Sequence, residues 1–453
     1  MSGGFVASVG ALSAARALAM ASQILVLPVM ARHLSPAEFG IVALAASIAA
    51  FANMFSDAGM GRSLIRTPLE RSDEWSSVFW LLAVIGLALT LALLAAAPAA
   101  SSFFDEPRLT APLAALAPLP LILSLNAAFA AEMEQRRAFG ELALSQVAAT
   151  VVSLAVALWM AVAGYGVWAL VAQQLLLIGL RAVWVVLRSR FRPRLYASRA
   201  ALGAHFGFGR DVTAASVLGY LGDQSTILVV GKALGAVELG LLSMTLRFAR
   251  LPMFGLAGPF GQVLYVRLTR TVEDVAAFRE VVLASTRLLS FMTLPPMAAI
   301  AVVADPAFAL ILSERWASVA PVFALIAGGA ALKAATHSTV VALTALGRTG
   351  ARLRLTAEIT MLWLLMLGAA SLHSLEAVAA AQTLWMLVQL PRHWAYLDRA
   401  CGIGAGAFLS AIAPGVVAAG FVTFAILAAG WLVPVAGWAW LAVAAAAAAT
   451  AFG

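Results

Sequence analysis

The stretch RHLSPAEFG, residues 32–40, has a counterpart later in the chain in KALGAVELG, residues 232–240. Both begin with a basic residue, place leucine third and glutamate seventh, and end on an apolar residue followed by glycine. Long apolar runs flank both copies. The two stretches therefore indicate an internal duplication with an offset of 200 residues.

The composition is that of a membrane protein. Of the 453 residues, 63% are hydrophobic and 11% are charged, whereas a soluble domain carries about 25% charged residues. The mean hydropathy is +0.97. A membrane-spanning helix needs about 20 predominantly apolar residues, and the apolar runs divide into about 14 such pieces. The sequence therefore predicts an all-α, polytopic fold with spans at residues 8–30, 37–59, 76–98, 111–133, 141–163, 166–189, 208–231, 237–259, 280–303, 317–343, 353–371, 375–396, 404–428 and 431–451.

The basic residues favour one orientation in the membrane. With the N-terminus in the cytoplasm, the cytoplasmic loops receive about 18 of the 29 Lys and Arg residues and the opposite loops about four. This asymmetry is the positive-inside bias, and it predicts that both termini are cytoplasmic. The net charge of +8 therefore lies mainly in membrane-flanking loops, which argues against nucleic acid as a partner.

The first apolar segment carries Arg16 in its middle and has no basic region ahead of it. It is therefore expected to be the first transmembrane helix rather than a cleaved signal peptide. Cys401 is the single cysteine, which excludes an intrachain disulfide, and the sequence has no zinc or haem spacing. No metal or cofactor is predicted.

The duplication extends beyond the opening stretches. The dipeptide Ala-Pro at residues 111–112 recurs at 320–321, and Ala-Gln at 172–173 recurs at 381–382. An acidic turn precedes each Ala-Pro pair, FFDEP before the first and SERW before the second. Each copy then holds six predicted helices, so both copies have the same orientation. Two parallel six-helix lobes are typical of transporters, with the substrate site at their interface near the membrane midplane.

These repeats predict three segments along the chain. Residues 1–200 and 201–400 form the two six-helix lobes, and residues 401–453 form two additional transmembrane helices. The last segment is rich in alanine, and its tryptophans are expected to anchor it at the membrane interface. Loops are short throughout, so no soluble domain is expected.

The first nonapeptide has a local structural explanation. Ser35 can cap the following helix, Pro36 suits its first position, and Glu38 stands where a capping box requires it. The second copy keeps Glu238 but lacks the Ser-Pro pair. The shared Leu, Glu and Gly are therefore predicted to set a tight turn between two helices. A role in contacting substrate is the less favoured alternative.

Polar side chains recur at helical spacing on the first predicted span and again, 200 residues later, on the seventh. Such faces are expected to meet a cavity or another helix rather than lipid. For the serines and the threonine, packing between helices is the preferred interpretation. The stripes comprise Ser13, Arg16, Met20 and Gln23 in the first copy, and Thr213, Ser216, Tyr220 and Asp223 in the second.

Basic residues within the predicted spans outnumber the acidic ones. Arg16 lies on the order of 12 Å into its helix, too deep to reach the interface easily. The excess predicts a water-filled cavity that holds an anion, with internal salt bridges as the alternative. A lone histidine such as His337 is more often a packed residue than a ligand. The cations are Arg16, Arg247, Arg250 and Lys333, and the acids are Asp223 and Asp57.

Several segments resemble a known family in the same order along the chain. They are LSPAEFGIVALA, FSDAGMGRSLIR, SSVFWL and FFDEP, then GYGVWALVAQQL at residues 164–175, the stretch at 222–252, and the SERW turn. The chain resembles the Wzx-type polysaccharide transporters of the multidrug, oligosaccharidyl-lipid and polysaccharide exporter superfamily. The resemblance implies a MATE-like, V-shaped bundle of two six-helix lobes. It also implies a flippase of the bacterial inner membrane that moves undecaprenyl-diphosphate-linked oligosaccharides from the cytoplasmic to the periplasmic leaflet.

The resemblance also implies a cationic central cavity, with Asp223 at a frequently acidic position and Arg247 at a frequently basic one. Arginine binds phosphate oxygens through two hydrogen bonds and keeps its charge when buried. Asp223 has a salt bridge to a cavity arginine as its alternative role. The site prediction therefore assigns diphosphate binding to Arg16, Arg247, Arg250 and Lys333, polar cavity lining to Ser13, Gln23, Asn53, Thr213, Ser216 and Tyr220, and ion coupling to Asp223 and Asp57.

Three other classes of membrane protein are alternatives to a flippase. A multidrug or other small-molecule antiporter would share the fold, but cationic drugs call for carboxylates in the cavity. A membrane glycosyltransferase or polymerase would need acidic and basic catalytic residues gathered at one membrane face, and the sequence shows no such group. A structural scaffold would not need arginines within its spans. The expected partners are the lipid-linked oligosaccharide, the bilayer, and polysaccharide polymerase and export machinery for exopolysaccharide, capsule or lipopolysaccharide.

Overall fold

The computed structural model describes residues 22, 25–57, 60–65, 67, 72–196, 198, 220, 222, 224–432 and 438–452. Within these residues the chain is helical and contains no strand. The chain divides into two compact units, Met1–Gly240 and Leu241–Gly453. Each unit is described by itself.

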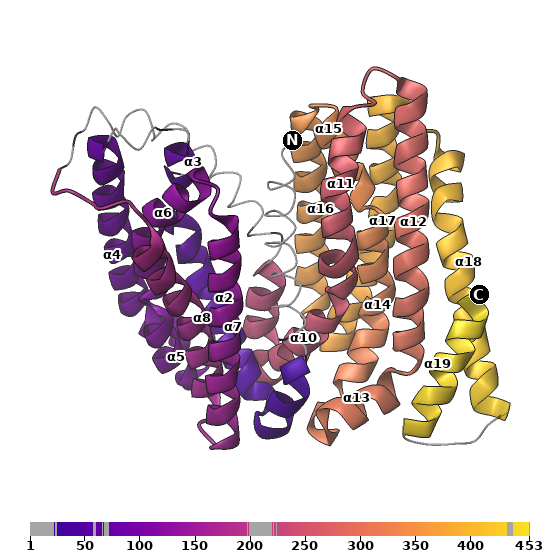
Figure 1. Ribbon diagram of the computed structural model, residues 1–453. Coiled ribbons are helices and arrows are strands. Elements are labelled where there is room, and N and C mark those ends of the chain that lie inside the picture. Colours follow the sequence, from indigo (N-terminus) through magenta and orange to yellow (C-terminus); the bar gives the residue numbers. More distant parts are fainter. Residues whose placement is uncertain are drawn as a thin grey trace. The chain divides into compact units, whose positions relative to one another are not determined.

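The first unit is built from long helices joined by short turns (Figure 1). Helix α4 packs against α6, and α7 packs against α8. Residues 25–33 and 224–233 are also helical. The helices are α2 Pro36–Ser56, α3 Met60–Leu64, α4 Ser72–Phe103, η1 Pro107–Leu109, α5 Thr110–Leu116, α6 Leu119–Gln135, α7 Phe139–Val162 and α8 Val167–Arg188; α10, Gly235–Ala249, continues into the second unit.

An aromatic cluster fixes one end of the first unit. Trp75 is fully buried, and its ring centroid lies 5.6 Å from that of Phe191. Phe79 packs between Phe129 and Phe191 at 5.7 and 6.2 Å. Because Phe191 follows the end of α8, these contacts hold the segment after α8 against α4 and α6.

The second unit has α14 near its centre. Helix α14 packs against both α12 and α17, and α12 also packs along α18. In the most apolar stretch of Val319–Ala345, 72% of the residues are buried. The elements are η2 Pro252–Ala257, α11 Gly258–Thr269, α12 Val275–Val302, α13 Ala304–Leu312, η3 Glu314–Trp316, α14 Val319–Ala335, α15 His337–Ala345, α16 Thr349–Ala370, α17 Leu375–Cys401, α18 Ala405–Leu432 and α19 Trp438–Phe452.

In the part of the chain that the structure describes, nine helices are long and apolar enough to cross a membrane. The chain is therefore a multi-pass membrane protein. These spans are Pro36–Ser56, Ser72–Phe103, Pro107–Gln135, Phe139–Val162, Val167–Arg188, Val275–Val302, Val319–Ala345, Thr349–Ala370 and Ala405–Leu432.

The predicted spans from residue 37 to 189 and from 280 to 428 fall on helices. Two of them are broken, because α5 ends before Pro118 and α14 ends at Thr336. The predicted span 237–259 is also interrupted, by the π-helical segment η2 after α10. Most of the spans predicted at 8–30 and 208–231 lies outside the described residues, so the count of about 14 stays a prediction.

The duplication is visible in the backbone of the two units. Asp105 and Ser313 both have positive φ, 54° and 107°, and each stands just before a short 3-10 helix. Arg137 and Gly347 also share positive φ, 61° and 69°, in the turns before α7 and α16. The compact units divide at Gly240 rather than at residue 200. The assignment of residues 1–200, 201–400 and 401–453 to two lobes and two extra helices stays a prediction.

Candidate functional site

The capping box predicted at the start of α2 is confirmed. The Ser35 hydroxyl accepts a hydrogen bond from the Glu38 amide at 3.4 Å, and the Ser35 amide donates to the Glu38 carboxylate at 2.7 Å. Pro36 occupies the first helical position. The local sequence alone therefore accounts for where this helix begins.

The two glycines that end the nonapeptides have a different role from the predicted tight turn. Gly40 and Gly240 lie inside α2 and α10, within the first unit. A Cβ on Gly40 would overlap the carbonyl of Ala236, and a Cβ on Gly240 would overlap the carbonyl of Pro36. The contact is reciprocal, because each partner stands four residues before the other glycine. The two copies therefore cross backbone to backbone, which only glycine permits here.

An ion pair lies close to this crossing in the sequence. The Lys232 ammonium is 2.6 Å from the Asp105 carboxylate and 5.2 Å from the centre of the Phe103 ring. In the same acidic turn, the Arg108 guanidinium donates two hydrogen bonds of 2.9 Å to Glu106, and this bonding lowers the pKa of Glu106. The FFDEP turn is thus tied to the second nonapeptide.

Neutral hydrogen bonds join α2 to the helical segment around residue 224. The Ser47 hydroxyl donates to the Gln224 side-chain oxygen at 3.1 Å, and the Tyr220 hydroxyl donates to the Ser47 carbonyl at 2.8 Å. The Tyr220 ring lies 5.2 Å from that of Phe51. Tyr220 was predicted as cavity lining, whereas Ser47 and Gln224 were missed. The signal for Gln224 was its position one helical turn after Tyr220.

Two further predicted residues lie near the end of α2. The Asn53 side-chain oxygen is buried, and the described residues offer it no hydrogen-bond partner. The Asp57 carboxylate accepts a hydrogen bond of 2.7 Å from the Gly61 amide and so caps α3. Asp57 therefore has a structural function, whereas the polar oxygen of Asn53 stays available within the first unit.

The second unit carries three of the predicted cations. Arg247 is exposed in the last turn of α10, and Arg250 is partly buried where α10 meets η2. Lys333 is exposed, although the adjacent Leu332 and Ala334 are only 6% and 0% exposed. Lys333 is therefore an exposed charge on an otherwise largely buried helix.

His337 follows Lys333 by four residues, which is about one helical turn. Its ring lies against Gly261 of α11, where a Cβ would come within 2.8 Å of Nε2. The charges of Arg352 and Lys333 both act on it. Arg352 also donates a hydrogen bond of 3.2 Å to the Thr344 hydroxyl. Lys333 and Arg352 thus place two positive charges near His337, an arrangement suited to an anion.

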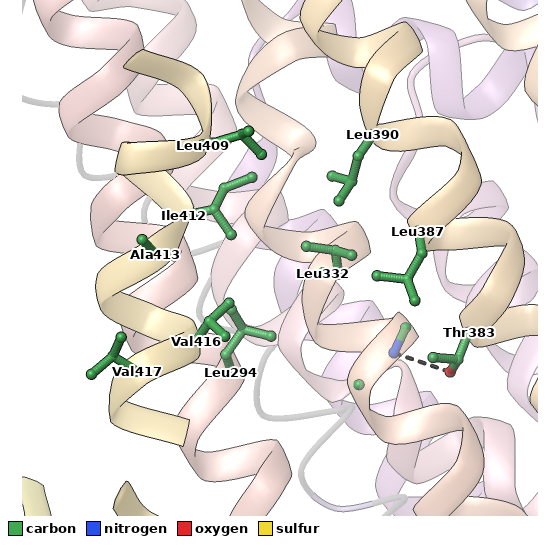
Figure 2. A pocket seen from close by; sticks show the side chains of 12 residues that line it. Leu294, Leu332, Thr383, Leu387, Leu390, Leu409, Ile412, Ala413, Val416 and Val417 are labelled. Carbon is green, nitrogen blue, oxygen red and sulfur yellow. Dashed lines mark hydrogen bonds between the residues drawn. The ribbon is translucent and has the colours of Figure 1, made fainter. Parts of the chain in front are cut away.

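An apolar cavity of about 460 Å³ lies elsewhere in the second unit. Figure 2 shows leucines of α17 on one side and side chains of α18 on the other. Its polar contact is the hydrogen bond of 3.2 Å that the Gly329 amide donates to the Thr383 hydroxyl. Such a cavity accepts hydrocarbon but not a sugar. It is lined by Leu294, Gly328, Gly329, Leu332, Thr383, Leu387, Leu390, Leu409, Ile412, Ala413, Val416 and Val417.

The remaining predicted site residues lie outside the described residues. They are Arg16, Ser13, Gln23, Thr213, Ser216 and Asp223. The described cations Arg247, Arg250 and Lys333 belong to the second unit, and Tyr220 and Asn53 belong to the first. Among the residues that the structure covers, no group of three or more His, Cys, Asp or Glu side chains gathers to hold a metal ion.

Curated relatives of the chain include bacterial proteins of polysaccharide assembly. The chain is 27% identical over 303 residues to the succinoglycan biosynthesis transport protein ExoT of Rhizobium meliloti (strain 1021), covering 66% of this chain and 61% of ExoT. It is 24% identical over 307 residues to the lipopolysaccharide biosynthesis protein WzxC of Escherichia coli (strain K12), covering 66% of this chain and 61% of WzxC. The chain thus matches less than two thirds of the length of each of these relatives.

Solved structures share the fold. The lipid II flippase MurJ in an inward closed conformation matches with a TM-score of 0.77 at 12% identity, covering 97% of this chain and 96% of MurJ. An inward-facing multidrug resistance MATE family transporter matches with a TM-score of 0.63 at 14% identity, covering 87% and 93%. The model of the family described as polysaccharide biosynthesis protein matches residues 29–321. The chain therefore belongs to this polysaccharide biosynthesis protein family.

Proposed function

We propose that the protein is a flippase that moves polyprenyl-diphosphate-linked oligosaccharide repeat units across the bacterial inner membrane for surface polysaccharide synthesis. It works by alternating access of two six-helix lobes within about 14 transmembrane helices, with both termini in the cytoplasm. Membership of the polysaccharide biosynthesis family and the MurJ-like fold support this proposal. The observation that carries it is the pair of exposed cations in the second unit, Arg247 on α10 and Lys333 on the membrane-spanning segment Val319–Ala345.

The chemistry of a lipid-linked oligosaccharide fits these surfaces. Its diphosphate carries two or more negative charges, and its glycan is too polar for the hydrocarbon core. A charge at the bilayer centre costs about 3 kcal/mol or more, so a charged side chain within a span favours a water-filled cavity and an anionic ligand. Arg247 and Lys333 supply cations, and guanidinium in particular matches phosphate oxygens. The polyprenyl chain meanwhile remains among apolar groups.

The proposed roles follow the two kinds of surface. Arg247, Arg250 and Lys333, together with Arg16, bind the diphosphate. Ion coupling is assigned to Asp223 and Asp57, and the Asp57 carboxylate also caps α3. The glycan meets the neutral polar groups Ser13, Gln23, Asn53, Thr213, Ser216 and Tyr220.

A multidrug antiporter is the second candidate, because MATE transporters share this fold. Cationic drugs would be repelled by the positive charges of Lys333 and Arg352, which both act on the space around His337. These charges therefore favour the anionic lipid-linked substrate over a cationic one.

Deletion of the gene in its host tests the proposal. We expect completed lipid-linked repeat units to accumulate on the cytoplasmic side while surface polymer is lost, as measured by extraction of the lipid fraction and by polysaccharide assay. Complementation with Arg247→Gln should restore little polymer. Arg267→Gln, which alters an exposed arginine at the end of α11, is the matched control and should restore it fully. Normal lipid-linked intermediates combined with altered sensitivity to cationic compounds would instead support an antiporter.

A further inference from the structure

A basic pocket lies at one end of the second unit, where α12 begins and where α15 and α17 end. Its volume is about 240 Å³. Arginine side chains form part of the wall, and apolar side chains form the rest. The lining residues are Val272, Val275, Phe278, Arg279, Leu346, Arg399, Ala400, Cys401 and Gly402.

The end of α17 holds two guanidinium groups in place. Arg279 donates from Nε to the carbonyl of Cys401, and Arg348 donates from Nη1 to the carbonyl of Arg399 at 2.9 Å. These bonds satisfy carbonyls that the helix end leaves without partners. A guanidinium has five N–H donors, so each group keeps further donors for a ligand.

Glycine makes the position of Arg279 possible. Gly402 has φ 68°, which ends α17 in the left-handed conformation. A Cβ at this position would overlap the Arg279 guanidinium. The guanidinium therefore lies against bare backbone at the base of the pocket, fixed before any ligand arrives.

The charge of the pocket is positive. Among the described residues, no ion pair joins Arg279, Arg348 or Arg399 to a carboxylate. The positive charges of Arg279 and Arg348 and the negative charge of Asp398 all act on the Cys401 thiol in the pocket lining. Since the side chain of Arg399 adds another positive charge to the lining, the pocket attracts an anion.

The position of the pocket identifies the anion as part of a lipid. Val275 begins a helix long and apolar enough to span the membrane, so the pocket lies at a membrane boundary. Val272 and Val275 are 36% and 49% exposed beside the arginines. Basic pockets between helices at this boundary are typical sites for anionic lipid headgroups. A free phosphate ion would use the arginines but would leave the apolar wall exposed.

We propose that this pocket binds the phosphate of an anionic phospholipid through Arg279 and Arg399, with the start of the acyl chains against Val272, Val275 and Leu346. Arg348, bonded to the Arg399 carbonyl, adds positive charge beside the pocket. The bound lipid joins α12, α15 and α17 at their common end. This site is separate from the cations proposed for substrate binding, and its test does not depend on transport.

Native mass spectrometry of the purified full-length protein tests the site. The protein is titrated with phosphatidylglycerol, with phosphatidylcholine and with inorganic phosphate. We expect phosphatidylglycerol to bind and phosphatidylcholine to bind at least about tenfold more weakly, because the net negative charge distinguishes them. Equal binding of the two lipids would overturn the proposal. Binding of inorganic phosphate in place of phosphatidylglycerol would also overturn it, by identifying a soluble anion as the occupant.

Variants locate the site on the protein. Arg399→Gln removes one positive charge from the pocket. The hydrogen bond that the Arg399 carbonyl accepts from Arg348 remains, because it involves the backbone. This variant should weaken phosphatidylglycerol binding about tenfold. Arg279→Gln should weaken it further, because it also loses the bond to the Cys401 carbonyl. The control Arg267→Gln removes an arginine outside the lining and should bind as the unaltered protein does. Unchanged binding in Arg399→Gln would contradict the assignment even if Arg279→Gln failed to fold.

Discussion

The two units share a repeated backbone but place different chemistry on it. In the first unit, α2 meets the segment around residue 224 through neutral hydrogen bonds at Ser47 and through glycine at Gly40. In the second unit, Arg247 and Lys333 are exposed on helices whose other faces are largely buried. The described contacts of the first unit at Gly40 and Ser47 thus hold helices together, whereas Arg247 and Lys333 of the second unit are proposed to bind the substrate. The contrast predicts that changes at Gly40 and Ser47 alter stability, whereas loss of charge at Arg247 and Lys333 alters transport.

The largest effect is expected from the double variant Arg247→Gln/Lys333→Gln. A hydrogen bond to a charged group contributes about 1.5–3 kcal/mol, so losing two should reduce transport by about 100-fold or more. Polymer export in the complemented host measures this. Thermal unfolding of the purified variant shows whether a loss of export comes from transport or from folding. Full export by the double variant would remove the proposed distinction between the units.

The next effect is expected from Gly40→Ala. The added methyl group would overlap the Ala236 carbonyl, and overpacking of this kind lowers the free energy of unfolding by about 1–3 kcal/mol. Thermal unfolding in detergent measures it. Gly179→Ala on α8 is the matched control, since a Cβ there has no atom within 4 Å, and it should leave stability the same or slightly higher. Equal behaviour of the two variants would show that the crossing does not constrain the helices.

A smaller effect is expected from Ser47→Ala. It removes the hydrogen bond to Gln224 but leaves the Ser47 carbonyl to accept from Tyr220, so it should cost about 1 kcal/mol of unfolding free energy. Export per folded protein molecule should equal that of the unaltered protein. If the same variant abolished export while the protein stayed folded, Ser47 would belong to the substrate surface.

The smallest effect is expected from Lys232→Ala. Its ion pair with Asp105 is short, but both side chains are largely exposed, so the pair contributes about 0–1 kcal/mol and less at high salt. Unfolding measured at low and high ionic strength should show a small difference that salt reduces. A loss that salt does not change would indicate that Lys232 acts through packing on Phe103 instead.

Local and periodic features of the fold were predictable from the sequence. The capping box at Ser35 and Glu38 needs only four consecutive residues, and the spans need only an apolar run of sufficient length. The helix breaks were missed, although Pro118 and Pro120 stand at the start of α6. At Thr336 the local sequence gives no comparable signal.

Long-range contacts could not be predicted in the same way. The glycine crossing brings together residues about 200 positions apart. The prediction of a tight turn considered only the sequence neighbours of Gly40 and Gly240 and therefore missed this contact. The hydrogen bond between Ser47 and Gln224 was missed for the same reason, because these residues are 177 positions apart in the sequence. The basic pocket needs three helix ends to meet, and no motif encodes that meeting. Lys333 is exposed on a largely buried helix, and its place in a water-filled cavity stays a prediction.

Reconstitution into proteoliposomes tests the central claim most directly. A polyprenyl-diphosphate oligosaccharide is placed in one leaflet, and its appearance in the other is followed with a glycan-modifying enzyme that cannot cross the membrane. The account predicts translocation that depends on the protein, persists in Ser47→Ala and falls by about 100-fold in Arg247→Gln/Lys333→Gln. Equal translocation by the double variant and the unaltered protein would contradict the assignment of diphosphate binding to the second unit. Failure of the folded, unaltered protein to move the lipid would contradict the flippase itself.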